Sequence, residues 1–232
     1  VLPEASATDY VTEYQIFRTL DRLRPTATGL DKLPAWFLRL GAPIFAKPLC
    51  SLFNRSIAAS TVPTQWKTAW IQPVPKVLLP TTPSHYRPIS ITPILTRIME
   101  RTVVQRYIYP AILHPPADFT FVDQYAFRPT GSTAAAIISL LDKITNLLVT
   151  EPYVIVISLD FSKAFDRVRH RSLLDKMAAM DLPDHVYNWL ISFFSRHSHC
   201  VKYLGETSTL KEITASLIQG SSVGPASYVV YA

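Results

Sequence analysis

The distribution of proline restricts this chain more than any other feature of its sequence. The chain has 19 prolines and only 6 glycines, and the prolines are concentrated between Pro63 and Pro93. Proline lacks the backbone N–H that a helix needs and biases the preceding residue toward extended conformations. We therefore predict that this region consists of extended segments and loops, with helices on either side of it.

The flanking regions carry apolar residues at helical spacing. Upstream, this pattern predicts two or three helices within Thr12–Leu23 and Pro34–Ile57. Downstream, the segment from Pro93 to Tyr109 has the pattern of an amphipathic helix. Its polar face bears Arg97, Arg101 and Arg106. A charged face of this kind is either solvated or turned toward phosphate groups, and the pattern alone does not distinguish the two.

The second half of the chain is predicted to contain both helices and strands. Helices are expected over Ser132–Leu148, with Ser132 as a cap, and over His170–Met180 and Pro183–Phe194. The segment from Tyr153 to Leu159 is apolar without polar alternation and rich in β-branched residues, so we predict a central strand covered on both faces. Finally, His199–Leu204 and Leu210–Leu217 are expected to form a hairpin around Gly205.

Composition narrows the class of protein. The chain has 232 residues, of which 48% are hydrophobic and 17% charged, and this composition is typical of a globular protein. The net charge of +6 gives modest support to a polyanionic partner. No apolar run reaches the roughly 18 residues of a membrane span, so a soluble, intracellular protein without a membrane partner is expected, nuclear or cytoplasmic. Cys50 and Cys200 are expected to be reduced and semi-buried, and the start at Val1 suggests a piece of a longer protein.

Two aspartates follow the predicted central strand. Asp160 comes where the apolar run ends, and a carboxylate in that place caps a turn, pairs with a base or binds a cation. For Asp166 we predict a local salt bridge, because Arg167 and Arg169 are close in the sequence. No Walker A segment and no Asp-x-Asp pair is present, so a kinase or phosphatase is poorly supported.

Four segments, in a fixed order, show what kind of protein this chain resembles. They are YRPISITPILTRIMERTVVQRY (86–107), DQYAFRPTGSTAAAI (123–137), VISLDFSKAFDRVRHRSLL (156–174) and LIQGSSVGPASYVVYA (217–232). Together they resemble the motifs of reverse transcriptases, most closely those of non-LTR (LINE-type) retrotransposons. Upstream, LPAWFLRL and VPTQWKTAWIQPVPK resemble the N-terminal extension of the fingers in the same family.

The resemblance implies an α+β right-hand polymerase fold. Residues 1–150 would form helical and extended fingers with an N-terminal extension, and residues 151–232 an incomplete palm with a central apolar strand; the thumb is absent. The implied activity is RNA-directed DNA polymerisation, with an RNA template, a DNA primer and deoxynucleoside triphosphates as partners. The transfer would use two Mg²⁺ ions, and Asp160 and the backbone carbonyl of Phe161 would be metal ligands.

The resemblance also implies nucleotide-binding roles. Lys76 and Arg87 would hold the triphosphate, Gln219 and Gly220 would approach the nucleotide, and Phe165 would exclude a 2′-hydroxyl. Arg128 would contact template or primer. Simpler alternatives remain for three of these residues: Lys76 as a surface cation, Phe165 as a core aromatic and Gly220 as a turn residue.

The sequence also departs from the family pattern. Ala126 stands where glycine is usual, and Thr130-Gly131 stand where Gly-Arg is common, which weakens a template contact in this segment. The second acidic motif, an aromatic-Ala-Asp-Asp turn, does not occur, and no Asp or Glu follows Glu212. We therefore expect the fragment itself to be inactive. The alternative is a degenerate remnant that binds nucleic acid without catalysis.

Overall fold

The N-terminal part of the chain is helical. A computed structural model describes residues 10–232, and residues 1–9 of the predicted fingers lie outside that range. Helix α1 (Glu13–Asp21) begins with a capping box, in which Thr12 Oγ1 accepts a hydrogen bond from Gln15 N and the Gln15 side chain accepts one from Thr12 N. Helices α2 (Ala35–Leu40) and α3 (Ala42–Ala58) follow, so the upstream helix predictions are confirmed.

The proline-rich region forms a β-hairpin. Strands β1 (Thr68–Pro75) and β2 (Tyr86–Ile91) pair antiparallel, and Pro73 lies opposite Pro88. Only single 3₁₀ turns, η2 (Thr64–Lys67) and η3 (Pro83–His85), interrupt the extended chain. The prediction of extended segments and loops is confirmed.

The hairpin belongs to a mixed sheet of five strands with β1 and β3 at its centre. Strand β3 (His197–Tyr203) runs parallel to β1, while β4 (Glu206–Thr207) and β5 (Lys211–Ile213) pair antiparallel with β3. Leu204 and Gly205 both have positive φ and make the tight turn between β3 and β4. The predicted hairpin around Gly205 is therefore confirmed.

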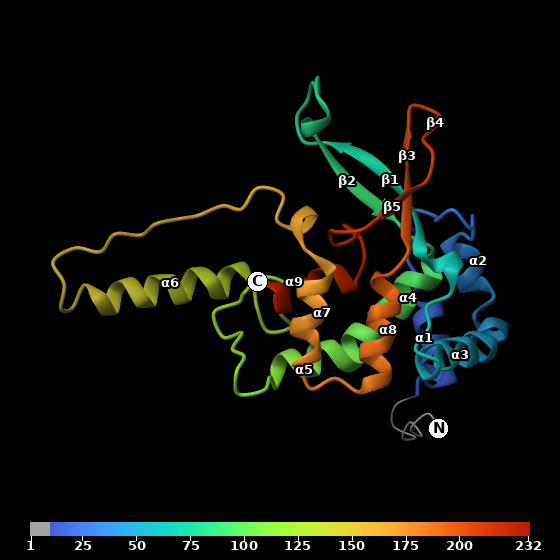
Figure 1. The fold of residues 1–232 in the computed structure, drawn as a ribbon, viewed down its shortest axis with the longest axis horizontal. Helices are drawn as coiled ribbons and strands as arrows, with labels where there is room; N and C mark the ends of the chain where they lie inside the picture. The colour runs from blue at the N-terminus through green and yellow to red at the C-terminus, as the bar shows by residue number, and fades with distance from the viewer. Residues whose placement is uncertain (1–9) are drawn as a thin grey trace.

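Helices from both halves of the chain pack on one hydrophobic core. Helix α4 (Ile94–Val103) continues through the π-helical turn η4 (Val104–Ile108) into α5 (Tyr109–Leu113). Helices α7 (His170–Ala178), α8 (Asp184–Phe194) and α9 (Val223–Tyr231) complete the layer around it (Figure 1). Phe53 of α3 and Trp189 of α8 are among the largest fully buried side chains of this core. The remaining helix predictions are confirmed apart from small shifts of their ends.

The prediction of a central strand over Tyr153–Leu159 is wrong. Residues 151–161 have no regular secondary structure, and the side chains of Ile157 and Leu159 are 78% and 79% exposed. Helix α6 (Thr133–Leu147), capped by Ser132 as predicted, precedes this segment, and together they extend away from the rest of the molecule (Figure 1). A strand forms only where another strand satisfies its backbone N–H and C=O groups, and within residues 10–232 no segment pairs with this one.

The structure contains both helices and strands, as the α+β prediction requires, and its sheet is mixed. Cys50 is half-buried and Cys200 is buried. Among residues 10–232, no helix combines the length and the apolar character needed to cross a lipid bilayer.

Candidate nucleotide site

The turn that contains Gln219 and Gly220 lies against strand β2. The backbone N–H of Ser90 donates a hydrogen bond to the Gln219 carbonyl oxygen, at 2.7 Å. Gly220 has a φ of +114°, and a Cβ added there would lie 2.4 Å from the Ser90 carbonyl oxygen. A side chain at position 220 would therefore meet both backbone strain and a clash. The close approach joins this turn to the strand that carries Arg87.

The same turn also contacts the 3₁₀ turn η5 (Phe165–Arg167). Leu217 N donates to Phe165 O at 3.0 Å, and Gln219 Nε2 donates to the Asp166 carboxylate at 3.2 Å. The prediction of a salt bridge between Asp166 and Arg167 or Arg169 is wrong. The ion pair found among residues 10–232 joins Lys143 and Asp123 instead. Arg167, one position away, does not face Asp166, and the chain leaves the 3₁₀ turn at the extended Val168 before it reaches Arg169. Asp166 instead accepts a hydrogen bond from the Gln219 amide.

Three aromatic side chains from three different sequence motifs meet beside this turn. The Phe165 ring stacks on Tyr228 of α9, with ring centroids 4.7 Å apart and planes inclined by 14°. Phe127 packs edge-on against both rings. Phe165 is half-buried, so neighbours hold its ring while part of it stays accessible. Phe127 and Tyr228 were not among the predicted site residues, although both lie inside the recognised motif segments.

The two predicted triphosphate cations lie on the β1–β2 hairpin. Arg87 pairs with Val74 across the hairpin, and its exposed guanidinium makes no hydrogen bond or ion pair within residues 10–232. Lys76 is exposed too, but its Nζ donates to Ser84 O at 3.0 Å and its backbone N donates to His85 O. Arg87 is thus the freer of the two to bind an anion.

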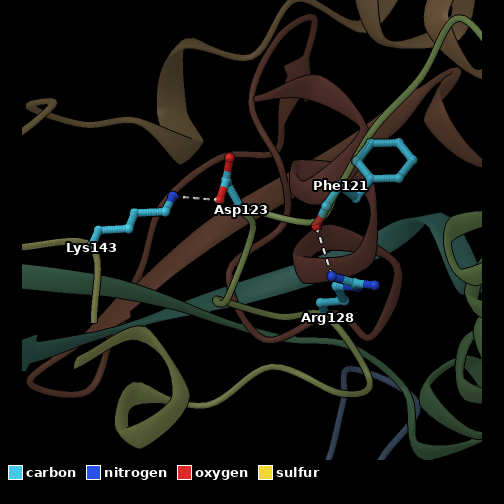
Figure 2. Close-up of polar contacts among 4 residues, drawn as sticks. All are labelled: Phe121, Asp123, Arg128 and Lys143. Atoms are coloured by element: carbon cyan, nitrogen blue, oxygen red, sulfur yellow. Dashed lines mark hydrogen bonds and ion pairs between the residues drawn. The ribbon is translucent and has the colours of Figure 1, made fainter. Parts of the chain in front are cut away.

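Arg128 has a structural contact in this conformation. Its Nη1 donates to the Phe121 carbonyl oxygen at 2.8 Å, while nearby Asp123 pairs with Lys143 of α6 at 3.0 Å (Figure 2). The first contact closes the loop between residues 121 and 128, and the second ties this loop to α6. A contact of Arg128 with template or primer therefore remains a prediction.

Within the described part of the chain, no hydrogen bond links Asp160 or Phe161 to the other predicted site residues. Both are exposed and lie in the segment that extends away from the body. No group of three or more His, Cys, Asp or Glu side chains able to hold a metal ion occurs among residues 10–232. The described residues therefore do not fit a two-ion site, which needs further acidic ligands beside Asp160.

A buried acid, Glu100, supports the turn from α4. It is fully buried, and its Oε2 accepts a hydrogen bond from Ser222 N at 2.6 Å, just before α9 begins. Burial raises the pKa of Glu100 to about 7, and hydrogen bonds from Ser221, Ser222 and Val223 partly oppose that rise. Glu100 was not among the predicted site residues, and the sequence pattern around it carries no local signal for a buried acid.

The raised pKa predicts a pH-dependent stability. Folded Glu100 holds its proton more tightly than the unfolded chain, whose value is near 4.5. The free energy of unfolding should therefore fall as the pH rises from about 4.5 to about 7, by on the order of 3 kcal/mol from this group. Glu100→Gln keeps a hydrogen-bond acceptor for Ser222 and should remove this part of the fall, as urea unfolding at pH 5 and pH 7.5 would measure.

A second buried group, His197, changes the free energy of unfolding in the opposite direction over part of this pH range. The pKa of His197 is lowered to about 3, first by burial and then by Lys67 and His170 nearby. His197 therefore adds stability to the folded state as the pH rises from about 3 to its unfolded value of 6.5, and this gain is complete above that value. The wild type and the Glu100→Gln variant both contain His197. The difference between their pH dependences of the free energy of unfolding therefore reports on Glu100 alone. An identical pH dependence in the two would contradict the assignment.

Comparison with known proteins decides the family. The model of the family "Reverse transcriptase (RNA-dependent DNA polymerase)" matches residues 74–232, well over half of the chain. This chain belongs to the reverse transcriptase family. The match includes all four motif segments, so the resemblance seen in the sequence is confirmed.

Relatives within this family come from mobile elements. The chain is 30% identical over 208 residues to the RNA-directed DNA polymerase from mobile element jockey of Drosophila melanogaster, covering 89% of this chain and 22% of the relative. It is 29% identical over 181 residues to the probable RNA-directed DNA polymerase from transposon X-element of the same species, covering 78% and 20%. The Pol polyprotein from the type-1 retrotransposable element R2 of Popillia japonica is 26% identical over 165 residues, covering 71% and 22%. This reverse transcriptase domain is thus of the LINE type, and the chain spans about a fifth of the length of these relatives.

Proposed function

We propose that the protein containing this chain is an RNA-directed DNA polymerase of a non-LTR retrotransposon. The proposal rests on one observation. Residues from all four motifs contact one another around the turn that contains Gln219 and Gly220, which we call the 217–222 turn. Ser90 comes from the first motif, Phe127 from the second, Phe165 from the third, and Gln219 and Tyr228 from the fourth. The fold thus brings residues from position 90 to position 228 to one place, which supports a shared site for the four motifs.

We propose that this convergence forms the deoxynucleotide-binding part of the site. The exposed guanidinium of Arg87 supplies positive charge for a triphosphate, because a planar fork suits phosphate oxygens. The Gly220 backbone, without a Cβ, leaves room for a close neighbour. Gln219 donates through its amide, which at present bonds Asp166. Lys76 would join Arg87 after releasing Ser84.

Asp160 and the Phe161 carbonyl are proposed as metal ligands. If these atoms hold a divalent ion, that ion would supply positive charge for phosphoryl transfer. A single exposed carboxylate does not make such a site, so Asp160 is one contributor among acidic ligands that residues 10–232 do not place beside it. The division into fingers (1–150) and palm (151–232) is part of the same proposal, as are the RNA template and DNA primer.

Primer extension tests the proposed function directly. The full-length protein that contains this chain would be given an RNA template, an annealed DNA primer, the four deoxynucleotides and Mg²⁺. Template-dependent lengthening of the primer would support the proposal. Tight binding of the primer and template without any lengthening would instead establish the non-catalytic remnant.

Sugar selection provides a sharper test of Phe165. The stacking of the Phe165 ring on Tyr228 supports a fixed position for the ring, and in that position it would exclude a 2′-hydroxyl. Phe165→Val should raise ribonucleotide incorporation relative to deoxynucleotides by roughly tenfold or more, the scale expected when a steric block is removed. The measurement is the ratio of kcat/KM for UTP and dTTP on one template.

Phe165→Tyr is the matched control, because it keeps a ring of the same width. It should retain the wild-type preference for deoxynucleotides. Unchanged selection in Phe165→Val would return Phe165 to a purely structural role.

A further inference from the structure

The carboxyl group of Glu100 is completely buried, although it lies on a helix whose other face is polar. Its relative exposure is 0%, and Arg97, three positions earlier on α4, is the charged group that attracts it. No ion pair within 4.0 Å joins the two among residues 10–232. A buried acid is costly unless hydrogen bonds compensate it, so its hydrogen-bond partners show what it contributes to the fold.

Those partners are the first backbone N–H groups of α9. Ser222 N donates to Glu100 Oε2 at 2.6 Å, and Val223 N donates to the same oxygen at 3.4 Å. The first N–H groups of a helix have no acceptor within the helix, and the Ser222 side chain does not cap α9. Ser221 Oγ accepts from Gly224 N at 3.1 Å. Glu100 therefore does the work of an N-cap side chain, from 122 positions away in the sequence.

Glu100 is one of two contacts that hold the 217–222 turn on either side of Gly220. Before Gly220, Ser90 N of β2 donates to the Gln219 carbonyl oxygen at 2.7 Å. After Gly220, Ser222 N donates to Glu100 of α4. Strand β2 and helix α4 are consecutive in the chain, so one continuous piece of structure grips the turn at both ends. The place of Gly220 relative to this piece depends on both contacts.

Nothing else in the described residues is placed to accept from these N–H groups. Val223 and Gly224 are buried, and a buried N–H without an acceptor costs about as much as a lost hydrogen bond. Without the Glu100 carboxyl oxygen, the start of α9 would have to move toward water to satisfy Ser222 and Val223. Gln219 and Gly220 would move with it, because only two residues separate Gly220 from Val223.

We propose that Glu100 is a positioning residue for nucleotide binding. By accepting from Ser222 and Val223, it fixes Gln219 and Gly220 beside the strand that carries Arg87. Glu100 is buried and does not touch the nucleotide, so it acts only through the turn. This inference rests on the proposed function, since it assigns Glu100 to the nucleotide site described there.

A pair of variants separates hydrogen-bond acceptance from the filling of space. Glu100→Gln keeps a side-chain oxygen acceptor, whereas Glu100→Met has a similar length but no oxygen. The probe is dTTP, bound to the full-length protein on an RNA template with a dideoxy-terminated DNA primer. Glu100→Met should raise the Kd of dTTP roughly tenfold, the scale of one lost buried hydrogen bond. Glu100→Gln should leave the Kd nearly unchanged.

Kinetics on an extendable primer distinguish positioning from a general loss of folded protein. Glu100→Met should raise the KM for dTTP with little change in kcat, because an interaction that supports nucleotide binding is removed. Partial unfolding would instead lower the apparent kcat and leave KM unchanged, and that result would overturn the proposal. Equal rises of KM in Glu100→Gln and Glu100→Met would also overturn it, since the charge and not the acceptor would then be responsible.

Ser56→Ala is the matched control, because it removes a buried acceptor far from the turn. Ser56 Oγ of α3 accepts from Trp189 Nε1 of α8 at 3.0 Å. The substitution should lower the free energy of unfolding, as urea unfolding would measure, but leave the KM for dTTP unchanged. A rise of KM equal to that of Glu100→Met would overturn the specific role of Glu100.

Hydrogen exchange tests the anchor without any nucleotide. In the full-length protein, the amides of Ser222 and Val223 should exchange faster in Glu100→Met than in Glu100→Gln, while the amides of α8 exchange alike in both. Equal exchange at Ser222 and Val223 would overturn the anchoring role. If the wild type does not extend primers, the proposed polymerase fails, but exchange and dTTP binding still test Glu100. Absence of dTTP binding by the wild type would overturn the nucleotide site and this role together.

Discussion

Replacing Asp160 with alanine should abolish primer extension by the full-length protein, with a loss of roughly a thousandfold or more. A thousandfold corresponds to about 4 kcal/mol on the activation barrier, which is within the charge stabilisation that a bound divalent ion supplies. Because the Asp160 side chain is exposed and makes no hydrogen bond within residues 10–232, the substitution should leave the melting temperature of the protein unchanged. Loss of activity without loss of stability is the signature expected of a ligand.

Asp175→Ala is the matched control for this experiment. Asp175 is also an exposed aspartate, on α7, and no role in the site is proposed for it. It should extend primers at the wild-type rate. Full activity in Asp160→Ala would remove Asp160 from the site, and equal losses in both variants would point to a general effect of charge.

Replacing Gly220 with alanine should destabilise the protein by about 3 kcal/mol. The positive φ alone costs roughly 1 kcal/mol for a residue with a Cβ, and the 2.4 Å approach to the Ser90 carbonyl oxygen forces the turn away from β2. Displacing the turn would also weaken the hydrogen bond from Ser90 to Gln219. Urea unfolding measures the loss, and deoxynucleotide KM in the full-length protein should rise with it.

Gly205 allows the two costs to be separated. It has a φ of +88°, but a Cβ there would meet nothing within 4 Å. Gly205→Ala should therefore cost only the backbone strain, about 1 kcal/mol. Equal destabilisation by the two substitutions would show that the contact between Gly220 and Ser90 contributes nothing to stability.

Most helices were predictable because their signals are local. The Thr12 capping box, the Ser132 cap and the apolar spacing of α4 and α8 each act within a few residues of the chain. The β1–β2 region was predictable for the same reason, since proline removes the helical alternative wherever it occurs.

The errors concern partners that are distant in the sequence. Tyr153–Leu159 has the composition of a buried strand, but a strand needs a neighbouring strand, and composition does not supply one. For Asp166, closeness in sequence to Arg167 suggested a salt bridge, whereas the folded chain brings the Gln219 amide to it from 53 positions away.

The sequence by itself determined the family, the helices and the residue types of the candidate site, because motifs and helical periodicity are written in consecutive residues. Only the tertiary structure decided that the four motifs meet at the 217–222 turn, that Tyr228 stacks on Phe165, and that Arg97 of α4 bonds the segment that follows α1. Each of these contacts joins residues far apart in the chain. Their geometry depends on how helices and strands pack around one core, and no local pattern encodes it.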